Sequence, residues 1–279
     1  MRRPQRKPAR KPVISAVCLC VTAALPGCVA LSGCAAASSS SASSSSASSS
    51  LGGSPPATAT APPAGVSSAF TVTGVNPVPS NGSQDTFTEA PDASCDTATL
   101  ATDHATGVKV ATGFALAGFS ASADLLTHFL GGTGTAVHYG AGSQIAAQAR
   151  ASAAFQAVDT EVTEAILSQL KAGQAHVRLS AAQLPLVAFE STSSDLYWGF
   201  RGTQGLTVTG TGSRQNGRYT GTLSYLIQDS YGFPADDTLD GFGPSMRYLQ
   251  TSCGAPQHAG GARWFPDTIT VQVPFSQPA

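Results

Sequence analysis

Residues 143–172, SQIAAQARASAAFQAVDTEVTEAILSQLKA, have the most regular helical pattern in the chain. Apolar and small side chains recur there every three or four residues, which places them along one side of an α-helix. They are Ile145, Ala149, Ser152, Phe155, Val158, Val162, Ile166 and Leu170. Alanine-rich flanks raise helix propensity, and Gly173 is a suitable stop. The pattern predicts one long amphipathic helix over 143–172, with its apolar stripe facing a core.

Patterns typical of β-strands dominate the chain after this helix. Alternating or apolar runs predict strands at 184–190, 195–200, 206–209, 219–227 and 268–275, and Asn216-Gly217 favours a tight hairpin turn. Before the long helix, residues 106–112 alternate weakly and suggest a strand. A short helix is expected from Ser120 or Ser122 to Leu130, ended by Gly131. The chain is therefore predicted to be α+β, with a long and a short helix packed on a mostly antiparallel sheet.

The N-terminus has the organisation of a secretory signal. Residues 1–12 contain six basic side chains and no acid, and the apolar run at 13–25 is shorter than the ~20 residues that a membrane-spanning helix needs. Leu31-Ser32-Gly33-Cys34 follows and resembles the lipobox of bacterial lipoproteins. The resemblance implies cleavage before Cys34 and lipid on its thiol. Leu25-Pro26-Gly27-Cys28 is a second candidate, and an ordinary signal peptide is the other alternative.

Three segments follow from this interpretation. They are the signal peptide at 1–33, a lipidated cysteine with a Ser/Ala/Pro-rich linker at 34–66, and a single domain at 67–279. The linker lacks the large apolar side chains that would offset the entropy of ordering it. We therefore expect a stalk that holds an extracytoplasmic domain off the cell membrane. The richness in alanine, glycine and threonine suggests an actinobacterial source.

Charge and cysteine content limit the function classes. Without residues 1–33, nine basic and sixteen acidic side chains remain, a net charge of −7, which disfavours binding to nucleic-acid phosphates. Only Cys95 and Cys253 remain besides Cys34, and a pair in an exported domain indicates a disulfide. Two free thiols are the alternative.

The most distinctive candidate site is the stretch YLIQDSYGFPADDTLDGFGPSMRY, residues 225–248. A strand is expected to end at Asp229, and a loop rich in aromatic, glycine and acidic residues follows. Asp229, Tyr231, Asp236, Asp237 and Asp240 are the candidate site residues. They could form a solvated loop, a Ca²⁺ site or a substrate contact, but the spacing differs from known calcium loops. No metal site and no cofactor are predicted.

Residues 225–233, YLIQDSYGF, resemble a strand of uncharacterised domains at the C-termini of bacterial secreted and toxin-associated proteins. The resemblance covers roughly 70 residues. Those domains often have an acidic or polar residue at the position of Gly232, where this chain departs from the pattern. The resemblance implies a shared fold and carries no activity.

No catalytic motif accompanies these features. The five histidines lack the HExxH spacing, and neither serine flanked by glycine completes a GxSxG turn. The sequence therefore favours a non-enzymatic envelope lipoprotein that binds a ligand or a partner in the envelope or cell wall. The alternative is a secreted hydrolase or toxin-like effector that acts on envelope material.

Overall fold

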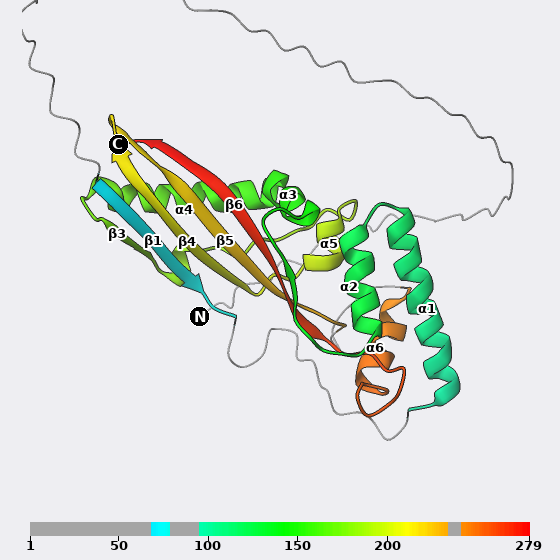
Figure 1. The fold of residues 1–279 in the computed structure, drawn as a ribbon. Helices are drawn as coiled ribbons and strands as arrows, with labels where there is room; N and C mark the ends of the chain where they lie inside the picture. The colour runs from blue at the N-terminus through cyan, green and yellow to red at the C-terminus, as the bar shows by residue number, and fades with distance from the viewer. Residues whose placement is uncertain (1–67, 79–94, 234–240) are drawn as a thin grey trace, which may run out of the picture. The chain divides into compact units, whose positions relative to one another are not determined.

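A computed structural model describes residues 68–78, 95–233 and 241–279 (Figure 1). The strands are β1 (Ser68–Asn76), β2 (Val137–Tyr139), β3 (His176–Leu179), β4 (Gly205–Gln215), β5 (Arg218–Tyr231) and β6 (Phe265–Pro278). The helices are α1 (Thr97–Leu116), α2 (Ser120–Leu130), α3 (Gln144–Ala151), α4 (Ala153–Lys171), α5 (Asp195–Phe200) and α6 (Gly243–Thr251), with a 3₁₀ turn, η1, at Ala181–Gln183. The α+β class is confirmed.

The described strands form a six-stranded sheet in the order β2-β6-β5-β4-β1-β3. The central pairs β1–β4, β4–β5 and β5–β6 are antiparallel, but β2 pairs with β6 and β3 with β1 in parallel. The sheet is therefore mixed rather than mostly antiparallel. The predicted hairpin is present: Asn216 and Gly217 both adopt positive φ, 50° and 73°, between β4 and β5.

One face of the sheet carries the core, and the other is polar. Tyr219, Leu223, Tyr225 and Ile227 of β5 face inward, as predicted, and α4 packs on this side. Phe155 of α4 meets Tyr225 edge to face at 5.0 Å, and the Tyr219 hydroxyl donates to the carbonyl of Leu170 at 3.0 Å. The exposed side chains on the opposite face include threonines of β1, β4 and β5: Thr71, Thr73, Thr209, Thr211, Thr220 and Thr222. Figure 1 shows α4 along the sheet and α1, α2 and α6 grouped beyond one end of it.

The predicted helix over 143–172 is two helices. Ser152 has an extended ψ of 143°, which interrupts the helical hydrogen bonds between α3 and α4. Its hydroxyl accepts from the backbone N–H of Phe155 at 3.2 Å and donates to the carbonyl of Ala149 at 2.7 Å. One side chain thus ends α3 and begins α4, which is a common role for serine at helix termini.

Three strand predictions are wrong. Residues 106–112 lie within α1, where Gly107 packs so closely on Leu130 that an added Cβ would lie 2.7 Å from its side chain. Residues 195–200 form α5, which buries Leu196, Gly199 and Phe200 at helical spacing. Residues 184–190 pair with no described strand, although Leu184, Val187 and Phe189 are buried. Short apolar runs fit either kind of element, and packing decides between them.

The short helix expected at 120–130 is confirmed as α2, and it packs against α1. α6 also packs against α1. No helix in the described part of the chain has the length and apolar character to cross a membrane.

Candidate functional site

Some of the predicted site residues lie in the described part of the chain, and others lie outside it. Asp229 and Tyr231 lie in the last residues of β5, which runs to Tyr231 instead of ending at Asp229, and both side chains face the core. Cys95 and Cys253 form the predicted disulfide. Asp236, Asp237, Asp240 and Cys34 lie outside the described residues, so the calcium hypothesis for the loop and the lipidation of Cys34 stay predictions.

Asp229 lies directly opposite Asp267 of β6 in the antiparallel register. Opposed residues in such a ladder share one face of the sheet, with Cβ atoms about 5 Å apart. Both acids therefore project into the core side, where Asp267 is 0% and Asp229 is 8% exposed. The structure thus pairs one predicted acid with an acid that the sequence analysis did not single out.

Burial raises the pKa of Asp267 well above the ordinary aspartate value, and the negative charge of Asp229 raises it further. No described residue forms a hydrogen bond to either carboxyl oxygen of Asp267. A carboxylate without donors is costly in such a place, whereas a neutral acid is much less so. Asp267 is therefore held protonated over a wider pH range than a surface aspartate.

Aromatic residues lie next to this pair along the same two strands. Tyr231 stacks on Phe265 at 5.6 Å between ring centroids and meets Phe129 and Phe233 edge to face. Burial, and next the charge of Asp267, raise the pKa of Tyr231. Burial also raises the pKa of Tyr139, with the nearby Asp124 contributing next. Both tyrosines are therefore neutral phenols across the physiological range.

A further buried acid, Asp195, has a different role. Its carboxylate accepts from the backbone N–H of Ala121 at 2.9 Å, and from the N–H and the hydroxyl of Ser122 at 2.7 and 2.6 Å. These groups lie at the start of α2, where unpaired backbone donors and the helix dipole favour an anion. Asp195 thus connects α5 to the start of α2, and both of its carboxylate oxygens accept hydrogen bonds there.

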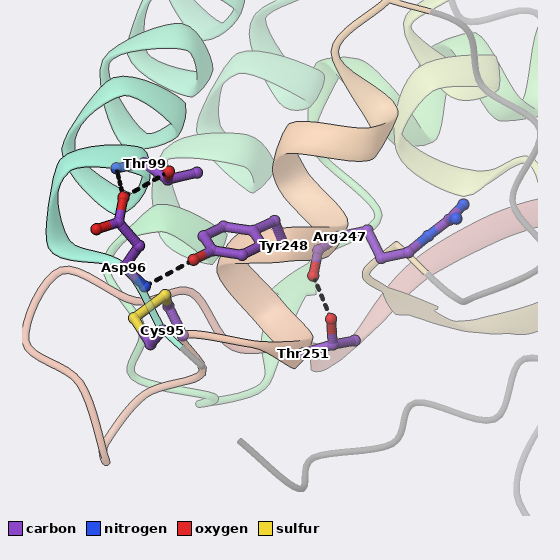
Figure 2. The surroundings of a disulfide bond; sticks show 7 residues. Cys95, Asp96, Thr99, Arg247, Tyr248 and Thr251 are labelled. Atoms are coloured by element: carbon purple, nitrogen blue, oxygen red, sulfur yellow. Dashed lines mark hydrogen bonds between the residues drawn. A yellow bond between two sulfur atoms is a disulfide. The ribbon is translucent and has the colours of Figure 1, made fainter. Parts of the chain in front are cut away.

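The disulfide between Cys95 and Cys253 connects the start of α1 to the end of α6 (Figure 2). Cys95 precedes α1, and Cys253 follows α6. Next to it, the Asp96 N–H donates to the Tyr248 hydroxyl at 2.8 Å. The Asp96 carboxylate caps α1 by accepting from the N–H and the hydroxyl of Thr99 at 2.7 and 2.6 Å, and these bonds lower its pKa. The bond and its polar neighbours thus hold the ends of α1 and α6 together.

Asp229 and Asp267 oppose each other across the two strands, but both carboxyls are buried. A substrate could reach them only if the surrounding side chains moved. Within residues 68–78, 95–233 and 241–279, no three His, Cys, Asp or Glu side chains are grouped so that they could hold a metal ion. The signal for Asp267 was available in the sequence, because it interrupts the inward row of Phe265, Ile269 and Val271.

In the comparisons with known proteins, no family matches the chain, and neither a curated protein nor a solved structure matches it. The two resemblances noted from the sequence therefore stay predictions.

Proposed function

We propose that the protein is a lipid-anchored lipoprotein of the bacterial envelope whose folded domain binds a ligand or partner outside the cytoplasm. The observation that carries the proposal is the bond between Cys95 and Cys253. Stable disulfides are typical of exported proteins and rare in the reducing cytosol. The basic and apolar N-terminus with its lipobox-like end supports the same compartment.

The burial and hydrogen bonding of the three core aspartates favour a binding function over hydrolysis. Asp267 is enclosed, Asp229 is nearly so, and Asp195 is engaged at the start of α2. The outward face of the sheet, by contrast, presents exposed hydroxyl groups from three adjacent strands. The acidic balance of the mature chain disfavours nucleic acid as the partner.

The alternative is a hydrolase or toxin-like effector that acts on envelope material. The opposed carboxyls of Asp229 and Asp267 favour this alternative, because a pair of neighbouring acids is a common arrangement for acid–base chemistry. It requires that a substrate gains access to these buried groups.

Intact mass measurement tests the proposal. Wild-type protein from membrane fractions, kept under non-reducing conditions, should begin at Cys34 and carry a diacylglyceryl-sized addition. The Cys34→Ala variant should lack this addition and leave the membrane fraction, whereas Cys28→Ala should behave as wild type. Wild-type protein found without lipid in the medium would refute the anchor.

A further inference from the structure

Along the border of the sheet at β6, only part of the strand pairs with another described strand. β6 spans Phe265–Pro278, and its three residues 267–269 pair with β2 on the side away from β5. From residue 270 onward, β6 pairs with β5 alone among the described strands. A strand border of this kind presents backbone N–H and C=O groups that can pair with another extended chain.

A groove lies along this border. Its walls come from the turn before α3, from α3, from the start of α4 and from β6: Ala141, Ala146, Ala147, Arg150, Ala151, Gln156, Val271 and Gln272. Packing of α3 against β6 forms the groove, and Figure 1 shows α3 beside the outer border of this strand. A helix facing the free border of a strand is an arrangement in which proteins bind extended peptides by strand addition.

Pro274 indicates how the backbone of β6 is oriented. It has no N–H, and prolines in sheets lie where the missing donor would point away from the ladder, so at Pro274 the free border offers a carbonyl but no donor. Gln272 is two residues away and has the same orientation, so its N–H and C=O point to the free border. β2 already pairs with the same border of β6 at residues 267–269, next to the groove.

The lining of the groove indicates the size and charge of the side chains that would fit it. Four of its side chains are alanines, so the space suits small side chains. Arg150 is exposed, and no described residue forms an ion pair or hydrogen bond with it. A guanidinium at such a place can bind a carboxylate through two parallel hydrogen bonds.

We propose that this groove binds an extended peptide segment of a partner protein, which adds as a strand to β6 and places a carboxylate against Arg150. The segment has small side chains where it faces α3. This inference rests on the proposed binding role and names the chemistry of the partner.

Fluorescence anisotropy tests it with a labelled heptapeptide that alternates alanine and threonine around a central aspartate. The Cys34→Ala chain is used, so the result is independent of membrane anchoring, and a failure here leaves the anchor test unaffected. The peptide should bind. Arg150→Glu should weaken binding at least tenfold and favour the same peptide with a central lysine. Arg178→Glu, an exposed arginine on β3, should change nothing.

Two further comparisons isolate the groove and the backbone pairing. Ala147→Leu fills the groove and should abolish binding. Ala105→Leu, at an exposed position of α1, should leave binding unchanged. A peptide with N-methylated backbone amides should fail to bind, because it has no N–H to donate to β6. Equal binding by that peptide, equal effects of Arg150→Glu and Arg178→Glu, or no binding at millimolar concentration would each overturn the proposal. A dimer in sedimentation that Arg150→Glu dissociates would assign the groove to a second copy and overturn it as well.

Discussion

Asp267 shows how one register position can change the behaviour of a side chain. On a surface strand it would be a solvated carboxylate. In β6 it faces the core, opposite Asp229 and next to the rings of Tyr231 and Phe265. Burial and the neighbouring charge both favour the protonated form, so the group links the stability of the fold to pH.

Asp267→Asn should remove that link. The neutral acid fits its site, so Asp267 favours folding below the ordinary pKa of 3.8, and this contribution is lost as the pH rises toward the raised pKa of the folded state. Over that window the wild-type free energy of unfolding should fall by up to about 1.4 kcal/mol per pH unit. The variant should show a shallower fall and an advantage that grows with pH. Urea unfolding at a series of pH values between 4 and 8 measures this.

Glu161→Gln is the matched control, because Glu161 is exposed on α4. Its unfolding curves should follow those of wild type at every pH. Parallel wild-type and Asp267→Asn curves would show that Asp267 has no raised pKa in the fold.

At the scale of elements, Ser152 decides the largest difference between the expected and the observed helices. The apolar stripe continues across it, from Ala149 to Phe155, so periodicity alone gives no break. The break comes from a hydroxyl that satisfies backbone groups on both sides. A serine hydroxyl can replace the hydrogen bonds between backbone groups of a helix. Packing in the core then determines whether the helix continues or breaks.

Ser152→Ala should lower the free energy of unfolding by about 1 kcal/mol, because the N–H of Phe155 loses its acceptor. Guanidinium chloride unfolding followed by circular dichroism measures the loss. Ser168→Ala is the control, since Ser168 is exposed in the body of α4 and alanine is the better helix former. A Ser152→Ala variant as stable as Ser168→Ala would show that the cap is dispensable.

The strongly patterned strands and the helix α2 were predictable, whereas α1 and α5 were not. β5 and β6 alternate over many residues, and Asn216-Gly217 marks the hairpin turn between β4 and β5, so local preference and tertiary packing agree. The six residues of α5 alternate as a strand would, yet they bury a helical face. In the site, Asp229 and Tyr231 were identified, but their partner Asp267 is 38 residues away along the chain and only the strand register brings it close.

At the scale of the whole molecule, the disulfide closes most of the folded chain. Cys95 and Cys253 are 158 residues apart, and they fasten the start of α1 to the end of α6. A crosslink over such a distance restricts the unfolded chain more than the folded one. The helices α1 and α6, whose ends the disulfide joins, lie beyond the end of the sheet (Figure 1).

The double variant Cys95→Ser/Cys253→Ser should lose about 2–5 kcal/mol of unfolding free energy. Guanidinium chloride unfolding under non-reducing conditions measures the difference. Wild-type protein reduced with dithiothreitol should match the variant, while the variant itself should be insensitive to dithiothreitol. Equal midpoints for oxidised wild type and the double variant would contradict this role.

The sequence by itself determined the α+β class, the hairpin, the faces of β5 and β6 and the cysteine pair, because each depends on local periodicity, turn chemistry or simple counting. Only the tertiary structure decided the parallel borders of the sheet, the break at Ser152, the opposition of Asp229 and Asp267, and the groove beside β6. These features depend on contacts between residues far apart in the chain, where burial and strand register outweigh local preference.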